Sequence, residues 1–145
     1  MFSSTQHFGA RKPSATAYRE VDASTALDGA SPHKLVSLLY AALAGQIACA
    51  RGALARREIG EKGRAIAQAV RILEEGLRMP LDMQAGGAIA SNLHNLYEYM
   101  TRQLTLANLK NDDAALIECA RLTDTLRQGW DGIADQVHAT SAMAA

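Results

Sequence analysis

The chain has 145 residues, 48% hydrophobic and 21% charged, a composition typical of one soluble globular domain. Fifteen basic and fifteen acidic residues cancel, so the chain has no positive surplus that would favour nucleic acid or an acidic membrane. Residues 1–17 lack the continuous apolar run of a secretory signal, and we expect them to form a disordered tail of a cytoplasmic protein.

Residues 18–30 are predicted to form an N-terminal arm or a short helix. Val21 and Leu27 give this segment enough apolar surface to dock on a larger body, but too little to fold alone. The folded domain is therefore expected to begin at residue 31, with the arm as a flexible attachment.

The first long helix is predicted to start at Ser31-Pro32, because serine caps free amides and proline fits the first helical turn. Residues 35–50 contain no charge, yet sixteen residues are fewer than the roughly twenty needed to cross a bilayer. We therefore expect a buried helix and no membrane span. Its inward stripe consists of Val36, Leu39, Leu43, Ile47, Ala50 and Leu54.

A second face of this helix carries small residues at helical spacing. Small side chains let another helix backbone approach closely. Two interpretations remain open, namely tight packing within this bundle or a groove for a helix of another protein. The residues of this face are Ala41, Ala44, Gly45, Ala48 and Gly52.

The second helix is predicted from Glu61 to Arg78, where Pro80 ends it. Its core positions are Gly63, Ile66, Val70, Leu73 and Leu77. Its other side is smoother and more apolar than a solvated face should be, which favours a surface reserved for a partner. That side carries Ala65, Ala69, Ile72, Gly76 and Met79.

The third helix is predicted to open at the glycine pair Gly86-Gly87 and to close at a polar turn near residue 111. Its apolar stripe is Ile89, Leu93, Leu96, Met100, Leu104 and Ala107. Amide and tyrosine groups off this stripe suit a partly wet surface that receives a partner. These are Asn92, Asn95, Tyr97 and Tyr99, with Leu106 beside them.

Asn111 or Asp112 is predicted to cap a fourth helix, which runs to residue 137. We expect Trp130 to be buried against the bundle end, and Cys49 and Cys119 to be free buried thiols. Short connections between four long helices predict an all-α, antiparallel up-down four-helix bundle over residues 31–137. Residues 138–145 are expected to be a disordered tail.

The sequence contains none of the patterns that carry catalysis or hold a cofactor or metal. Paired Glu-x-x-His sequences, a Gly-rich phosphate loop and cysteine pairs with metal spacing are all missing from the chain. We therefore expect neither an enzyme nor a cofactor. One alternative is a histidine phosphotransfer domain acting through His94, although Glu98 one turn later would repel an incoming phosphoryl group. Another is a structural bundle that associates with itself.

Three blocks of sequence, in order, resemble the FliS family of flagellar export chaperones. The likeness runs from about Tyr18 to Ile133. The blocks are Tyr18 with Ala30-Ser31-Pro32-His33-Lys34-Leu35-Val36; Lys62-Gly63 with Leu81-Asp82; and Gly86-Gly87-Ala88-Ile89-Ala90 continuing through Asn92-Leu93 and Leu96-Tyr97-Glu98-Tyr99-Met100.

The resemblance implies a cytoplasmic, ATP-independent chaperone that binds the C-terminal segment of flagellin. Such a protein prevents premature polymerisation and keeps flagellin competent for type III export, with the export gate as a further partner. It also implies that no nucleotide or metal is used, and that the arm covers part of the groove until flagellin displaces it.

The expected client surface combines the smooth side of the second helix with the polar side of the third. It consists of Ala65, Ala69, Ile72 and Gly76, together with Asn92, Asn95, Tyr99 and Leu106. The arm and the start of the first helix are expected to act through Tyr18, Ser31 and Pro32.

Overall fold

A computed structural model describes residues 31–144, with side-chain surroundings given for residues 31–133. The predicted tail 1–17 and arm 18–30, including Tyr18, lie outside the described residues. The described chain is all helical, in the order α3 (Pro32–Ala55), α4 (Ile59–Arg71), η1 (Ile72–Arg78), α5 (Gly87–Lys110) and α6 (Asp113–Ala144). The predicted four-helix bundle is confirmed.

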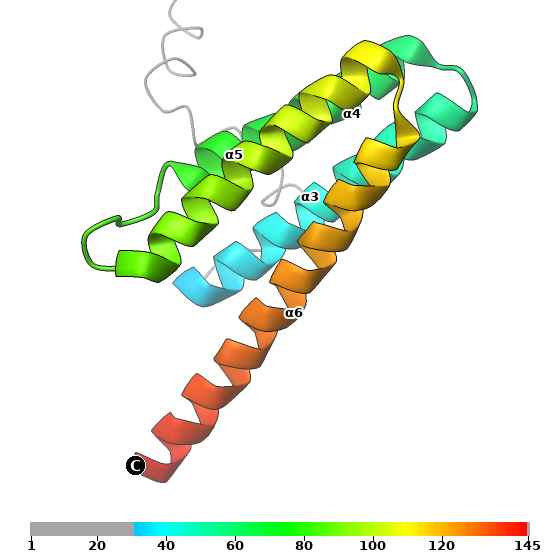
Figure 1. Cartoon of the computed structure of the whole chain (residues 1–145). Helices are drawn as coiled ribbons and strands as arrows, with labels where there is room; N and C mark the ends of the chain where they lie inside the picture. Colours follow the sequence, from blue (N-terminus) through cyan, green and yellow to red (C-terminus); the bar gives the residue numbers. More distant parts are fainter. Residues whose placement is uncertain (1–30, 145) are drawn as a thin grey trace, which may run out of the picture.

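The helices run up and down around a shared core (Figure 1). α3 packs against α4 and α6, and α5 packs against α4, η1 and α6, so each helix lies beside the ones that precede and follow it. α6 continues to Ala144, past residue 137 where the sequence analysis ended the bundle. Figure 1 shows this last part of α6 extending beyond the ends of the other helices.

Local chemistry sets most helix ends where the sequence predicted them. The Ser31 hydroxyl accepts from the backbone N–H of Lys34 at 3.1 Å, and Pro32 occupies the first helical position. The Asp112 carboxylate accepts from two amides in the first turn of α6, at 3.0 and 3.4 Å, and so caps that helix. Asn111 instead ends α5 in the left-handed conformation, with φ 53° and ψ 45°.

The glycine pair before α5 is required at both positions. Gly87 has φ +55°, a conformation that disfavours any side chain. A Cβ at Gly86 would lie 2.6 Å from the Cβ of Ala90 and 2.9 Å from the carbonyl oxygen of Asp82. The chain therefore needs both glycines to turn tightly into α5.

The second helix has a feature that the sequence did not predict. Its last seven residues, Ile72–Arg78, form a π-helix, in which the N–H of Met79 bonds to the carbonyl of Glu74 at 3.0 Å. π-helical turns are rare, and many lie at functional sites. Ile72, Leu73, Gly76 and Leu77 are buried within this π-helix.

The inward face of α5 differs in phase from the prediction. Ile89 is 73% exposed, so its assignment to the core stripe is wrong. Ala90 and Tyr97, which are one heptad apart, take the inward positions with Met100, Leu104 and Ala107. Tyr97 was expected at the surface, but its hydroxyl bonds to that of Tyr40 inside the bundle.

α3 is the central apolar helix of the described chain. By length and composition alone it could cross a membrane, since its most apolar 18-residue stretch has a mean hydropathy of 1.4. The core helix of a soluble protein has the same properties, and α3 supplies Leu39, Leu43 and Ile47 to the core cluster. Polar bonds join it to α6, because Arg51 pairs with Asp113 and Ser37 donates to Asp131.

Candidate functional site

The small-residue face of α3 lies on the outside of the bundle. Gly45 and Ala48 are exposed, while Ala41, Ala44 and Gly52 are partly buried. Cys49, which was expected to be buried, is also exposed on this side of the helix. We call these six residues, Ala41, Ala44, Gly45, Ala48, Cys49 and Gly52, the α3 face. The structure thus excludes tight packing within the bundle for its centre.

Two properties make the α3 face suited to another helix. Five of its six residues lie within residues 35–50, which contain no Asp, Glu, Lys or Arg; the sixth, Gly52, follows Arg51. A Cβ built at Gly45 would meet nothing within 4 Å, so the space above that residue is open. At Gly45 and Ala48 an incoming helix would therefore meet small side chains and could approach the α3 backbone closely, whereas the Arg56 guanidinium lies beside Gly52.

The smooth side of α4 is not such a surface. Ala65, Ala69 and Ile72 have no exposed area, and Gly76 is also buried. The three side chains belong to the same core cluster as Leu39, so the assignment of this strip to an exposed client surface is wrong. Helical periodicity identified an apolar strip, but the neighbouring helices of the bundle already cover it.

The polar side of α5 is at the surface as predicted. Asn92 and Asn95 are exposed, while Tyr99 and Leu106 are partly buried. The Tyr99 hydroxyl donates to the Glu118 carboxylate of α6, 2.8 Å from each oxygen. This hydrogen bond is the main cause that raises the pKa of Tyr99, so its hydroxyl stays protonated.

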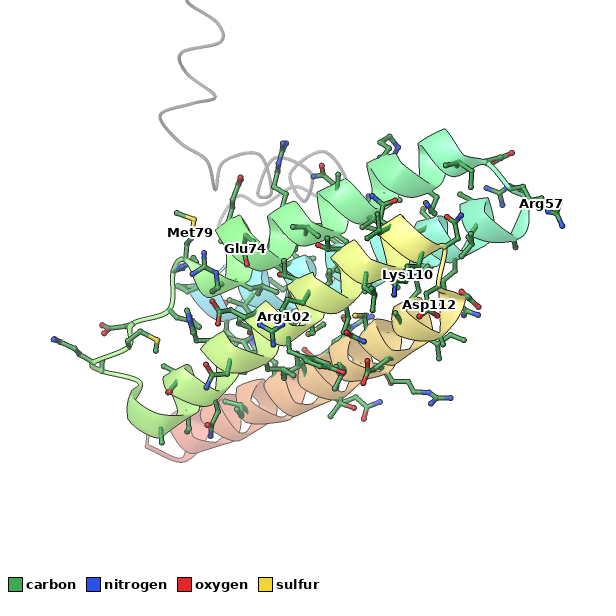
Figure 2. All side chains as sticks on the ribbon, turned by 45° about the horizontal axis from the view of Figure 1, so that its top comes forward. Arg57, Glu74, Met79, Arg102, Lys110 and Asp112 are labelled. Atoms are coloured by element: carbon green, nitrogen blue, oxygen red, sulfur yellow. The ribbon has the colours of Figure 1, made fainter. Side chains whose placement is uncertain are left out.

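Glu118 also lines an open groove of about 560 Å³ between α5 and α6. Gln103 of α5 forms one wall and donates to Glu118 at 2.9 Å. Ala115 and Ile117 give the groove an apolar floor. The groove is bordered by α5 and α6. In Figure 2, Arg102 marks α5 and Asp112 marks the turn into α6. This groove was not predicted from the sequence, because its walls come from helices that are paired only in the fold.

His94 is poorly placed to accept a phosphoryl group. Its Nε2 lies 3.6 Å from a carboxylate oxygen of Glu98, one turn along α5. A carboxylate at that distance would repel phosphate, as the sequence had indicated. Within residues 31–133, no three His, Cys, Asp or Glu side chains gather as a metal site would require.

The start of α3 is tied to α6 at one end of the bundle. The His33 ring stacks on the Trp130 ring, with centroids 4.5 Å apart and planes inclined by 13°. Nε2 of His33 donates to the carbonyl of Trp130, and the Trp130 indole N–H donates to the carbonyl of His33, both at 2.9 Å. Trp130 is partly buried there, so Ser31 and Pro32 begin a firmly anchored helix.

Comparison with known proteins gives a consistent result. The family described as "Flagellar protein FliS" matches residues 14–137. Flagellar secretion chaperone FliSB of Pseudomonas aeruginosa is 42% identical over 116 residues, which cover 80% of this chain and 91% of the relative. Flagellar secretion chaperone FliS of Salmonella typhimurium is 38% identical over 117 residues, which cover 81% of this chain and 87% of the relative. The protein of that name from Vibrio cholerae is 35% identical over 126 residues, which cover 87% of this chain and 92% of the relative.

Proposed function

Because the chain belongs to the FliS family of flagellar secretion chaperones, which are not enzymes, we propose that its client is the C-terminal segment of flagellin. Binding would keep that segment from polymerising before export and hold it ready for the flagellar type III apparatus. The export gate is then a second partner of the loaded chaperone, and the cytoplasm is the site of action.

The observation that carries this proposal is the exposed, charge-free α3 face. Water-exposed helix faces usually carry charged and polar side chains, whereas this one carries alanine, glycine and cysteine. A helix with an apolar stripe would bury that face and satisfy its own backbone hydrogen bonds internally. This is the helix-in-groove mode of peptide recognition.

The length of α3 suits a client that is disordered before it binds. Its 24 residues span about 36 Å at 1.5 Å per residue, and the α3 face, residues 41–52, occupies about half of that length. Ordering a flexible segment typically costs about 2–5 kcal/mol of the gross interaction energy. A contact along a whole helix can offset that cost, whereas a single small pocket would not.

The polar side of α5 provides a second contact in this proposal. Asn92 and Asn95 offer exposed amides, and Leu106 offers apolar surface on the same side of the helix. Tyr99 is held by Glu118, so it presents a fixed ring to a client. A client that covers these amides without forming hydrogen bonds to them would bind more weakly, which would give specificity. α3 and α5 both pack against α4 and α6, so a segment that contacts both surfaces would have to pass over one of those helices.

The test compares two glycine substitutions by calorimetric titration with a flagellin C-terminal peptide. Gly45→Glu places a carboxylate in the α3 face, and Gly129→Glu places the same charge on α6. A Cβ meets nothing within 4 Å at either position. Each variant should be about 0.5–1 kcal/mol more stable than the parent, because glycine is unfavourable inside a helix.

We expect Gly45→Glu to weaken binding at least tenfold, since a helix seated on the α3 face would bury an unpaired carboxylate. Gly129→Glu should bind as the parent does. Unchanged binding by Gly45→Glu would remove the α3 face from the client site. Sedimentation of the free parent checks self-association, because a dimer that Gly45→Glu dissociates would make this face a contact between copies.

A further inference from the structure

An apolar pocket of about 210 Å³ opens at the end of the bundle where α3 and α5 begin. We call it the end pocket. All four helices contribute to it: its apolar walls include Val36 of α3, Leu77 of η1, Leu93 of α5 and Trp130 of α6. The pocket is larger than a cavity of about 150 Å³, which holds one benzene ring. It is smaller than the roughly 300 Å³ at which sites for drug-sized ligands begin.

Two buried tyrosines form another part of its wall. Tyr40 and Tyr97 are each only 2% exposed, and both line the end pocket. Their hydroxyl oxygens are 2.5 Å apart, so one hydroxyl donates to the other. Burial raises the pKa of both tyrosines, so both protons are retained over the physiological range.

Within the described residues, this arrangement provides an acceptor for only one of the two hydroxyl protons. Two hydroxyls carry two protons, and the shared bond uses only one of them. Among the described residues, no other group bonds to either hydroxyl. The Trp130 indole N–H is already bonded to the carbonyl of His33, so it does not compete for a ligand. A buried donor without a partner is costly, and an arriving acceptor would relieve that cost.

A third hydroxyl suits this pair of tyrosines best. A carbonyl or thioether would accept one bond and offer no proton, whereas a hydroxyl also donates. Three hydroxyls can then form a closed ring in which each donates once and accepts once. Asp82 also lines the pocket, but its carboxylate already accepts from the backbone amides of Gln84 and Ala85. A water molecule needs two to four polar partners, and the rest of the wall is mainly apolar. A phenol ring matches both the volume and the polar requirement.

We propose that the end pocket binds one tyrosine side chain of the client segment, an inference that rests on the proposed function for the identity of that client. The phenol ring would fill the apolar space, and its hydroxyl would complete the bonds of Tyr40 and Tyr97. The end pocket is then an anchor that selects for tyrosine over phenylalanine.

The pocket itself is tested with p-cresol and toluene, which differ only in the hydroxyl. The single indole N–H resonance of Trp130 reports binding in nitrogen–proton correlation spectra of the full chain. We expect p-cresol to bind at least fivefold more tightly than toluene, because its hydroxyl would form two bonds in the ring and one net hydrogen bond alone is worth about fivefold. The double variant Tyr40→Phe/Tyr97→Phe should bind toluene as before and lose the preference, because it removes both hydroxyls without changing shape.

Equal affinities of the parent for the two probes, or no change at Trp130, would overturn the proposal. Binding of p-cresol only after Tyr18→Ala, which removes the ring, would also overturn it, since the pocket would then belong to the chain's own Tyr18. Neither experiment involves flagellin, so their outcome is independent of the proposed function.

The client is tested by filling the pocket. Leu93→Trp places a large side chain in the pocket wall, and Leu109→Trp makes the same change on the same helix at a residue that is 78% exposed. We expect at least tenfold weaker binding of the flagellin peptide for Leu93→Trp and no change for Leu109→Trp. Equal binding by both variants overturns the anchor and leaves the chaperone function standing. A parent that binds no flagellin refutes the function itself.

Discussion

The turn between α5 and α6 depends on a buried lysine, and its contribution can be measured. Lys62 of α4 is only 2% exposed, and its ammonium donates to the carbonyl of Asn108 at 2.9 Å and to the side-chain oxygen of Asn111. Both acceptors lie at the C-terminal end of α5, where carbonyls lack partners within the helix and a positive charge is favourable. We predict that this bond holds the turn that borders the α5–α6 groove.

Two substitutions at Asn111 separate the hydrogen bond from the backbone conformation. Asn111→Gly keeps the left-handed φ of 53° without strain but removes the acceptor. It should lower the free energy of unfolding by about 1.5–3 kcal/mol, the usual contribution of a bond to a charged group. Asn111→Ala also incurs the left-handed conformation, so it should cost about 1–2 kcal/mol more.

The assay is urea unfolding of the full chain followed by circular dichroism, with Lys62→Met completing a double-mutant cycle. Methionine retains most of the apolar stem and removes the charge. In that background Asn111→Gly should cost almost nothing, which gives a coupling energy of about 1.5–3 kcal/mol. A coupling energy near zero, or equal stability of the glycine and alanine variants, would refute this account of the turn.

Three further predictions follow from individual contacts. Iodoacetamide should modify exposed Cys49 in the free protein and more slowly in the flagellin complex, while Cys119 stays unreactive because burial raises its pKa to about 12. The hydrogen bond from Arg51 lowers the pKa of Asp113 from 3.8. At neutral pH the parent should therefore be more stable than Asp113→Asn, and in acid titrations this difference should disappear as the pH falls through the lowered pKa. Trp130→Phe should lower the free energy of unfolding by about 1 kcal/mol in urea, through loss of the indole hydrogen bond.

The α3 and α4 strips show how far helical patterns reach. Both were visible as runs of small or apolar residues, and both were candidates for a partner surface. The α3 strip is open, with free space above Gly45, whereas Ala65 and Ala69 of α4 are fully buried. The periodicity of apolar residues in a sequence shows which residues share one face of a helix. It does not report how many neighbours cover each face, and that number separates core from groove.

The end pocket could not have been predicted for the same reason. Tyr40 and Tyr97 are 57 positions apart, and the second had been assigned to the surface. Only the packed bundle brings their hydroxyls into contact, where residues 31–133 provide an acceptor for one of the two protons. The π-helix at Ile72–Arg78 is likewise set by packing, because the local sequence has no residue that requires wider turns.

The sequence alone determined where most of the helices begin and end, since a serine or aspartate cap, a proline in the first turn and a pair of glycines act through their own backbone. It also determined that four apolar stripes would assemble into one bundle. The tertiary structure decided which remaining faces stay open, which α5 residues point inward and where a pocket forms. Those outcomes depend on contacts between residues distant in the chain, and one helix carries no information about the shape of its neighbours.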